Sequence, residues 1–291
     1  MKIALFRCCN THVFLKHYES VMDSVLIKLD VEAVDVKEFG CCGYPLKNIS
    51  FKAYILCSAR NLSLAEKKGL DIITFCSCCY NSLKRANHLM KEDVSIQKEI
   101  NTILKKEGLR YDGGVEVKHF LDVVYKDIGI KNMKEKREKT FRGLNIATHY
   151  GCQLLKPRQI MKFDNPLAPS IFDELVEITG AKSILWPTKL QCCGAPAWGI
   201  NDDLSMDLME RKIRDARQSG ADFLCTTCPF CQLQFDRVQK VLVSKRNLNH
   251  YIPSIHYSQL LGLSLGIDAQ DLGIDKNELD LTGIMDFLHK G

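Results

Sequence analysis

The sequence predicts an α/β protein built from two pseudo-symmetric halves, residues 1–140 and 141–291. Two observations predict this fold: short apolar runs alternate with stretches of helical periodicity, and one pattern of cysteines occurs twice in the same order. Strands that alternate with helices form parallel βαβ units. The length of 291 residues also suits two domains of about 150 residues each.

Four apolar, β-leaning runs of the first half predict buried strands. Between the first two runs, Tyr18, Val21 and Val25 follow the 3.6-residue period of a helix. Parallel strands of one sheet end at the same edge, and ligands of such folds bind there, where loops lead into helices. The expected strands are residues 2–6, 31–39, 71–75 and 115–118.

Two polar stretches are expected to be scaffold. Residues 91–112 carry Ile96, Ile100 and Ile103 at helical spacing, which predicts an amphipathic helix that covers the first half. Residues 131–142 are a run of mixed charges between the halves. We interpret this run as a solvated linker or helix face.

The composition is that of an ordinary globular protein. Hydrophobic residues make up 46% and charged residues 26% of the chain, which excludes disorder, collagen and coiled coil. The net charge of +5 is small for a nucleic-acid binder and fits an anionic small molecule or an acidic partner better. No signal peptide and no apolar run of about eighteen residues is visible, so we expect a cytoplasmic protein without a membrane span.

Fourteen cysteines are the unusual feature of the composition. Because disulfides are rare in the reducing cytosol, grouped cysteines are expected to bind metal or do redox chemistry. Ten of them form two ordered sets of five, and a glycine and a proline follow the vicinal pair in both. The spacing nearly repeats, since 33 residues separate Cys42 from Cys76 and 34 separate Cys193 from Cys228. The first set is Cys9, Cys41, Cys42, Cys76 and Cys79, and the second set is Cys152, Cys192, Cys193, Cys228 and Cys231.

The cysteines of the first set follow expected strands, and some lie near expected helix starts. Pro229 after Cys228 is well placed as a first helical residue, and Cys76 and Cys79 precede the helical pattern of residues 80–90. The positive end of a helix dipole stabilises a thiolate, which is the form that binds metal.

Five thiolates in each half exceed the four that a zinc site or an ordinary iron–sulfur cubane needs. The surplus implies an unusual cluster, or a four-ligand cluster beside a reactive cysteine. Structural zinc is one alternative, which leaves the fifth thiolate unexplained. A thioredoxin-like dithiol at Cys76 and Cys79 is another, and it leaves Cys9, Cys41 and Cys42 unused.

These motifs resemble the cysteine-rich CCG-domain family, and more closely its members that serve as B subunits of the heterodisulfide reductases of methanogenic archaea. The resemblance rests on residues 6–10 (FRCCN), 41–47 (CCGYPLK) and 76–84 (CSCCYNSLK), and it covers essentially the whole chain. It implies two Rossmann-like CCG domains whose sites face a shared cleft. It also implies two noncubane 4Fe-4S clusters, each held by one set of five cysteines.

The resemblance further implies reduction of the mixed disulfide of coenzyme M and coenzyme B to the two thiols, in methanogenesis. Disulfide reduction needs two electrons, so two clusters at one cleft can supply one each. The implied partners are a ferredoxin-like C subunit, a flavin-containing A subunit, and a hydrogenase or formate dehydrogenase behind them. The alternative is an electron-transfer iron–sulfur subunit of a hydroxy-acid dehydrogenase of the glycolate or lactate type, which binds no disulfide.

Substrate contacts are sought among cationic side chains, because coenzyme M ends in a sulfonate and coenzyme B in a phosphate. Lys156 and Arg158 are the first candidates. They lie in the gap after Cys152, which has 39 residues against 31 in the first half. The other cations near the cysteine loops are Lys16, Lys47, Lys84, Arg85 and Lys189.

Three histidines and four further cysteines remain. His119 and His256 occupy matching positions and are interpreted as helix-start contacts, whereas His149 is a weaker candidate for proton delivery. Cys57 and Cys225 are expected to pack in a helix and in a strand. A shift of one residue would exchange the remaining two cysteines, Cys8 and Cys78, with neighbouring ligands.

Overall fold

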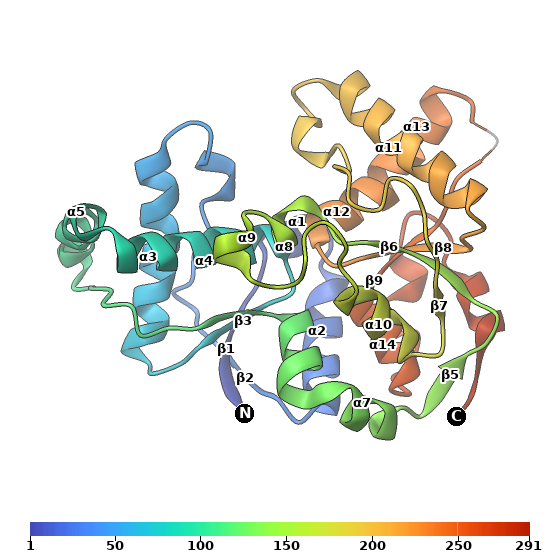
Figure 1. Cartoon of the computed structure of the whole chain (residues 1–291), viewed down its shortest axis with the longest axis horizontal. Helices are drawn as coiled ribbons and strands as arrows, with labels where there is room; N and C mark the ends of the chain where they lie inside the picture. Colours follow the sequence, from blue (N-terminus) through green and yellow to red (C-terminus); the bar gives the residue numbers. More distant parts are fainter. Residues whose placement is uncertain (249) are drawn as a thin grey trace.

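The computed structural model describes residues 1–248 and 250–291 and contains two four-stranded parallel sheets (Figure 1). Neighbouring strands run parallel throughout both sheets, which confirms the α/β class. The first sheet has the order β2-β1-β3-β4, with β1 (Lys2–Phe6), β2 (Glu32–Asp35), β3 (Ile72–Thr74) and β4 (Val117–His119). The second has the order β7-β6-β8-β9, with β6 (Asn145–His149), β7 (Lys182–Ser183), β8 (Phe223–Thr226) and β9 (Ser254–His256).

All four strands expected in the first half are present, but the second is shorter than predicted. The run 31–39 forms a strand only over Glu32–Asp35. This strand lies at the sheet edge and pairs only with β1, so the residues after Asp35 are free to leave the sheet. They form the loop that leads to Cys41.

Helices connect the strands and cover the sheets. Those of residues 1–140 are α1 (Cys9–Phe14), α2 (His17–Lys28), α3 (Phe51–Lys67), α4 (Ser77–Glu92), α5 (Val94–Leu104), α6 (Phe120–Asp122) and α7 (Ile130–Lys136). Those of residues 141–291 are α8 (Cys152–Leu155), α9 (Arg158–Met161), α10 (Ile171–Glu177), α11 (Asp202–Gln218), α12 (Pro229–Leu233), α13 (Gln239–Lys245) and α14 (Tyr257–Ser264). Short 3-10 helices occupy Tyr44–Leu46, Lys105–Glu107, Ala195–Ala197, Ile274–Lys276 and Thr282–Phe287, and π-helical turns occupy Val123–Gly129 and Gln234–Val238.

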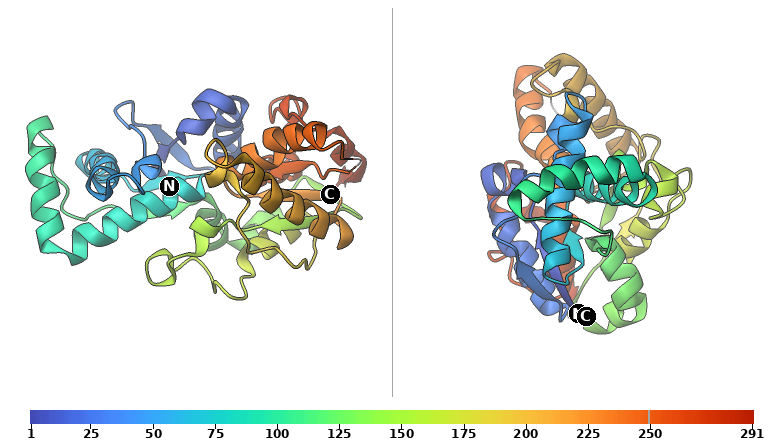
Figure 2. Two further views of the ribbon diagram at one scale, coloured as in Figure 1. Left: turned by 90° about the horizontal axis from the view of Figure 1, so that it is seen from above. Right: turned by 90° about the vertical axis from the view of Figure 1, so that its left-hand side faces the viewer.

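The two polar stretches behave differently. The amphipathic helix expected in 91–112 is α5, which buries Ile100 and Leu104 and lies with α3 and α4 at one end of the molecule, as both views in Figure 2 show. The charged run 131–142 is only in part the expected helix face. After α7 the chain forms β5 (Lys139–Phe141), which pairs antiparallel with β10 (Leu288–Lys290). The final strand of the chain therefore anchors this connection.

The two halves share one continuous hydrophobic core, so the division at residue 140 stays a prediction. Helices α2 and α14 pack together across the two halves. At their contact the buried Tyr18 hydroxyl donates a hydrogen bond to Oε1 of Gln259 at 3.0 Å and accepts one from Nδ2 of Asn277 at 3.3 Å. Among the described residues, no helix combines the length and the apolar character needed to cross a membrane.

Replacing the buried hydroxyl at this contact should destabilise the protein. Tyr18→Phe removes one hydrogen-bond partner from the buried amide of Gln259 and one from the half-buried amide of Asn277, and we expect the free energy of unfolding to fall by about 1 kcal/mol in urea denaturation. Tyr251→Phe, at a tyrosine that is 42% exposed, is the control and should change nothing. Equal stability of the two variants would contradict the role of this contact.

Candidate metal centre

Loops at the carboxyl ends of the parallel strands carry both sets of cysteines. In each half, one cysteine opens a short helix after the first strand, a vicinal pair precedes a 3-10 turn, and a Cys-x-x-Cys pair starts a helix after the third strand. The first half uses Cys9 of α1, Cys41 and Cys42, and Cys76 and Cys79 at the start of α4. The second half uses Cys152 of α8, Cys192 and Cys193, and Cys228 and Cys231 at the start of α12.

One detail of this placement differs from the prediction. Helix α4 begins at Ser77, so Cys79 lies in its first turn instead of preceding it, and Cys76 is the N-cap residue. Pro229 is the first residue of α12, as expected, with Cys228 as the N-cap. The two N-cap cysteines therefore sit at the positive ends of two helices.

Sulfur atoms of the two sets meet where these helices begin. Cys76 Sγ lies 3.6 Å from Cys228 Sγ, and Cys228 Sγ lies 3.9 Å from Cys78 Sγ. Within the second set, Cys193 Sγ is 3.6 Å from Cys231 Sγ. All fourteen cysteines are free thiols, so none is withdrawn from the centre by a disulfide.

The first cysteine of each vicinal pair is held as a thiolate. Hydrogen bonds from neighbouring thiols of the same set lower the pKa of Cys41 and of Cys192 to about 2. A backbone N–H contributes in both halves, since the nitrogens of Gly43 and Gly194 lie 3.4 Å from the Sγ atoms of Cys41 and Cys192. The thiolate is the form of cysteine that binds metal.

These two glycines cannot be replaced by larger residues without strain. Gly43 has a φ of +84° and Gly194 a φ of +90°, in the left-handed region. A Cβ atom on Gly43 would lie 2.7 Å from the carbonyl oxygen of Tyr54, and one on Gly194 would lie 2.4 Å from that of Ser205. The glycine after each vicinal pair is thus needed for the turn that aims its N–H at the sulfur.

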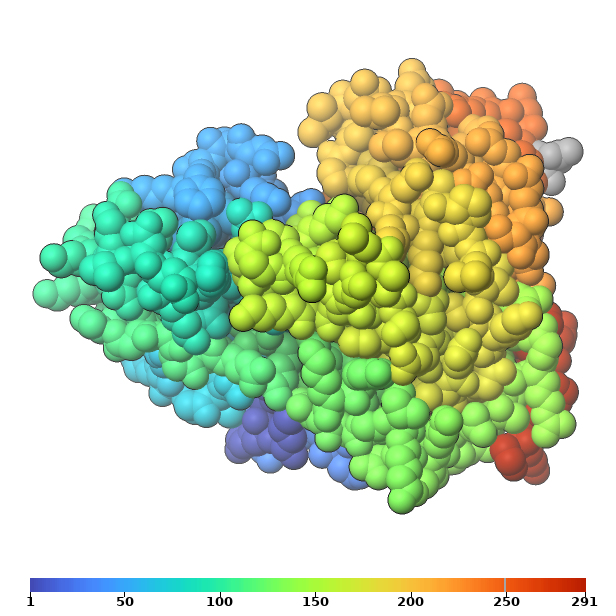
Figure 3. All heavy atoms as spheres, viewed as in Figure 1, coloured from blue at the N-terminus to red at the C-terminus, as the bar shows by residue number. Residues whose placement is uncertain are grey.

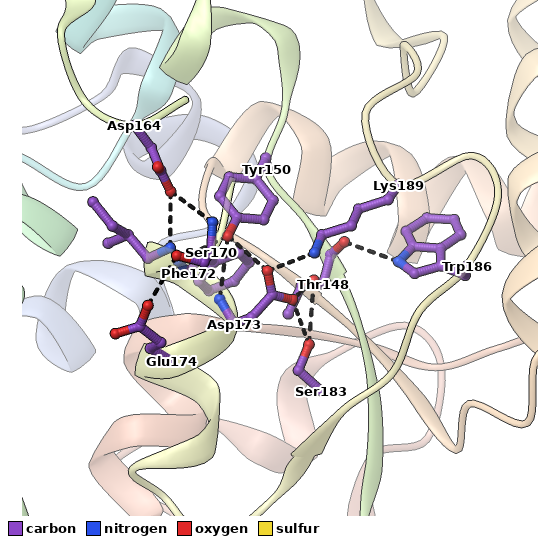
Figure 4. A network of polar contacts seen from close by, with 11 residues as sticks. Thr148, Tyr150, Asp164, Ser170, Phe172, Asp173, Glu174, Ser183, Trp186 and Lys189 are labelled. Atoms are coloured by element: carbon purple, nitrogen blue, oxygen red, sulfur yellow. Dashed lines mark hydrogen bonds and ion pairs between the residues drawn. The ribbon is translucent and has the colours of Figure 1, made fainter. Parts of the chain in front are cut away.

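A polar network supports the loops of the second set (Figure 4). The carboxylate of Asp173 accepts hydrogen bonds from Thr148 at 2.7 Å, Tyr150 at 2.8 Å and Ser183 at 2.5 Å, and pairs with Lys189 at 2.5 Å. Burial raises the pKa of Asp173, but these contacts outweigh burial and lower it below its usual value. Lys189, a candidate for substrate binding on sequence grounds, is therefore engaged within the protein.

His119 and His256 have the structural role that their matching positions predict. Both are buried, and each ring Nδ1 accepts a hydrogen bond from the backbone N–H two residues later, at 3.2 Å from Leu121 and 3.3 Å from Ser258. They cap the starts of α6 and α14. Burial lowers the pKa of His119 to about 4 and that of His256 to about 3, so both rings are neutral at pH 7.

His149 lies among the sulfur atoms of the second set. Its ring shares one group with Cys193 and Cys231 in which all potential ligand atoms lie within 4.8 Å of one another. The ring is buried, and among the described residues neither of its nitrogens has a hydrogen-bond partner. Burial lowers its pKa well below the usual value. The proximity of His149 to these two thiols is not visible in the sequence, because strand pairing decides it.

Cys8 and Cys78, which the sequence does not assign as ligands, also lie among the sulfurs. Cys8 groups with Cys76 and Cys79, and Cys78 groups with Cys76 and Cys228. The ten-residue ligand assignment consequently stays a prediction.

The remaining two cysteines lie in the expected elements. Cys225 is buried in β8, whereas Cys57 in α3 is only half-buried.

A small cavity between the halves is lined by the second set of cysteines. Tyr44, Ser77 and Cys78 of the first half line it together with residues of the second half, among them all five cysteines of the second set. The rings of Tyr44 and Phe230 meet edge to face within this lining, with their centres 6.2 Å apart. Figure 3 shows the surface notched between the segments near residues 50 and 200.

The cations near this cavity are not the two selected from the sequence. Lys156 and Arg158 are exposed, and neither belongs to the described cavity lining. Lys47, at the end of the 3-10 turn Tyr44–Leu46, is half-buried. Burial and then the charge of Arg85 lower its pKa, while the thiols of Cys152 and Cys78 oppose this shift. Lys47 and Arg85 thus lie close enough to the cavity for electrostatic interaction with its thiols. Lys156 and Arg158 are exposed to solvent, and no interaction of theirs with the cavity thiols is seen among the described residues.

The donor set fits an iron–sulfur centre better than a single ion. Soft thiolate ligands select zinc, copper(I) or iron–sulfur clusters, and one zinc ion needs only four ligands. More than four sulfurs meet in the contacts described above, and several of them are fully buried. A polynuclear cluster uses more thiolates than one ion can.

Comparison with known proteins agrees with this chemistry. Residues 3–84 and 146–236 match the Cysteine-rich domain family, CCG. The chain is 38% identical to the B subunit of the ferredoxin/F(420)H(2)-dependent CoB-CoM heterodisulfide reductase of Methanosarcina acetivorans, over 96% of this chain and 94% of that protein. It is 31% identical to the 8-methylmenaquinol:fumarate reductase membrane anchor subunit of Wolinella succinogenes, over 90% of this chain and 91% of that protein.

A solved structure supports the fold alone. The crystal structure of a hypothetical protein from Helicobacter pylori superposes with a TM-score of 0.78 at 19% identity, over 97% of this chain and 52% of that chain.

Adding a methyl group to the glycine of a vicinal-pair loop should prevent its site from loading. In Gly43→Ala and in Gly194→Ala the new Cβ would clash with a backbone oxygen, so the N–H would no longer point toward the sulfur. After anaerobic reconstitution, the iron content per chain of each variant should fall toward half of the wild-type value. Gly40→Ala, whose Cβ meets nothing within 4 Å, is the control. Full iron content in both loop variants would show that the loop conformation is dispensable.

Single cysteine variants decide between the ligands and their neighbours. We expect Cys9→Ala and Cys41→Ala to lose iron and acid-labile sulfide, because they belong to the predicted set, whereas Cys8→Ala and Cys78→Ala should retain both. Iron and sulfide counted per chain provide the measurement. Loss from Cys8→Ala with retention in Cys9→Ala would reassign the first ligand by one residue.

Proposed function

Because the chain belongs to the CCG cysteine-rich domain family, we propose that it is the B subunit of a heterodisulfide reductase and that it reduces the mixed disulfide of coenzyme M and coenzyme B. The observation that carries this proposal is the contact between the two sets of thiols, 3.6 Å apart at Cys76 and Cys228, beside a cavity that both halves line. The similarity to a protein named as the B subunit of such an enzyme supports it.

The proposed cofactors are two noncubane 4Fe-4S clusters, one for each set of five cysteines. Cys9, Cys41, Cys42, Cys76 and Cys79 would hold the first, and Cys152, Cys192, Cys193, Cys228 and Cys231 the second. Such clusters supply electrons one at a time. The protein contributes preformed thiolates at Cys41 and Cys192 and loops held by Gly43 and Gly194.

The overall reaction consumes two electrons and two protons and converts one disulfide into two thiols. We place the approach of the disulfide at this small cavity, because all five sulfurs of the second set and Cys78 line it. The aromatic rings of Tyr44 and Phe230, which meet edge to face in the cavity lining, offer apolar surface to the chains on either side of the disulfide. The disulfide would therefore bind between the halves.

The anionic ends of the substrate require cations, for which the chain offers two pairs. We favour Lys47 with Arg85, because Lys47 interacts with thiols of the cavity lining. Lys156 and Arg158 remain the pair proposed from the sequence, and both are exposed after α8. An exposed cation is screened by water and contributes less to binding than a half-buried one.

The proposed partners deliver the electrons. Cys9 and Cys41 are exposed, so the first set is the accessible side for a ferredoxin-like C subunit. A flavin-containing A subunit and a hydrogenase or formate dehydrogenase would stand behind it, in the cytoplasm.

A second candidate function is electron transfer without disulfide chemistry. The similarity to a fumarate reductase subunit favours it, because the same fold then serves an oxidoreductase with another substrate. The glycolate- or lactate-type dehydrogenase subunit belongs to this class. Such a protein would carry clusters but would not reduce the heterodisulfide.

Turnover with an artificial donor separates the two functions. The anaerobically reconstituted chain with reduced methyl viologen should oxidise the viologen when the heterodisulfide is added, and Cys42→Ala and Cys193→Ala should abolish this activity because each removes a ligand of one cluster. Absorbance of the viologen radical gives the rate. Loaded protein without turnover would favour the electron-transfer function, and full turnover by either variant would refute the need for both clusters.

The two cation pairs can be compared in the same assay. Lys47→Met combined with Arg85→Met should raise KM for the heterodisulfide by about tenfold or more, since one lost charge-assisted contact to an anion costs about 1.5–3 kcal/mol. Lys156→Met combined with Arg158→Met is the matched pair and should leave KM nearly unchanged. The opposite pattern would restore the pair chosen from the sequence.

A further inference from the structure

Lys212 is a buried cation beside the second set of cysteines. Its side chain is 1% exposed, on α11, and the ammonium donates a hydrogen bond to the carbonyl oxygen of Thr188 and lies 4.4 Å from the centre of the Trp186 ring. Burial lowers the pKa of Lys212 to about 8, while the thiols of Cys193, Cys231 and Cys192 act to raise it. Helix α11 packs against the 3-10 turn Ala195–Ala197, which follows the vicinal pair of the second set, and this packing places Lys212 beside the second site.

The charge of Lys212 is offset only weakly by a carboxylate, because Asp215 acts on it without forming an ion pair. Within residues 1–248 and 250–291 it forms no ion pair, in contrast to two other cations near the cysteines. Arg7, beside Cys9, pairs with Asp23 and Asp35, and Lys189 pairs with Asp173. A buried charge without a partner is costly, so its natural counter-charge is the anionic sulfur of the second site.

The first set has a neutral residue at the corresponding position. Lys212 follows Cys192 by 20 residues, and Asn61 follows Cys41 by 20 residues, each on the 17-residue helix after the vicinal pair. Asn61 is 1% exposed, and its amide holds the loop before Cys42 through Gly40 and Cys41. Both side chains thus support a cysteine loop, but only one of them carries a charge.

A fixed positive charge in a low-dielectric site favours the state of the cluster that has gained an electron. We propose that Lys212 raises the reduction potential of the second cluster above that of the first, so that electrons pass from the first set to the second and collect beside the cavity that the second set lines. Lys212 would act through its positive charge on the cluster and would not contact the substrate. This inference rests on the proposed function for the presence of the clusters, not on the identity of the disulfide.

The accessibility of the two sites agrees with this direction. Cys9 and Cys41 of the first set are exposed, whereas all five cysteines of the second set are buried or half-buried. Cys76 and Cys228 lie 3.6 Å apart and connect the two sites. An electron would arrive at the exposed set, cross at this contact and stay at the set that Lys212 favours.

Potentiometric titration of the loaded chain, followed by electron paramagnetic resonance, tests the proposal. In wild type, two clusters should titrate at distinct potentials. In Lys212→Met the higher potential should fall so that the reduction equilibrium shifts at least tenfold, or about 59 mV for one electron, and the lower should not move. Lys212→Gln, which keeps a donor for Thr188, should shift in the same way, and Lys212→Arg should restore the wild-type value.

Two further variants control for structure and for site. Arg211→Met removes an exposed charge next to Lys212 and should move neither potential. Asn61→Asp adds a negative charge at the matching position of the first set. This variant should lower the reduction potential of the first cluster and leave that of the second cluster unchanged.

The proposal is overturned if wild type titrates as a single potential, if Lys212→Met and Lys212→Gln with full iron content leave both potentials unchanged, or if Asn61→Asp and Lys212→Met move the same signal. A wild-type chain that binds no iron would refute the proposed function and this inference with it. Loaded protein that fails only to reduce the heterodisulfide would leave the order of potentials standing, so the two failures are distinguishable.

Discussion

The structure depends on bringing many thiols into contact without letting them form disulfides. The sulfurs must converge from loops that are far apart in the chain, and parallel strands solve this because all of their carboxyl ends meet at one edge. The loops of the two edges meet, so that Cys76 and Cys228 lie 3.6 Å apart. Glycine turns, helix caps and the Asp173 network all serve to hold these loops.

The two cysteine sets share a backbone arrangement, but their charged neighbours differ. The two sheets have the same strand order, and the glycine N–H meets the sulfur at 3.4 Å in both. The charges do not repeat. Lys212 occupies the position that Asn61 has in the first half. Two other cations near the cysteines are both paired, Lys189 with Asp173 and Arg7 with two aspartates. Two sites with one backbone design thus experience different electrostatic fields.

The candidate site could be predicted unevenly from the sequence. The cysteine loops could be predicted, because their repeated spacing is visible in the sequence. The helix-start role of His119 and His256 was predicted from the same repeat. The charged and titratable neighbours of the sulfurs could be predicted only in part, because Lys47 and His149 were lower-ranked candidates and Lys212 was not a candidate. Lys47, His149 and Lys212 lie near the sulfurs because of how strands and helices pack. The sequence instead favoured Lys156 and Arg158, which are close to Cys152 along the chain but are exposed after α8.

By itself, the sequence determined the α/β class, the strands and helices that carry the cysteines, and the likeness of the two cysteine sets, since periodicity and spacing are local properties of the chain. Only the tertiary structure decided which sulfurs touch, that Cys8 and Cys78 lie among them, and that a buried lysine stands beside one set alone. The reason is physical: contact between loops depends on sheet register and helix packing, and burial sets the strength of a charge, and neither can be read from the order of the residues.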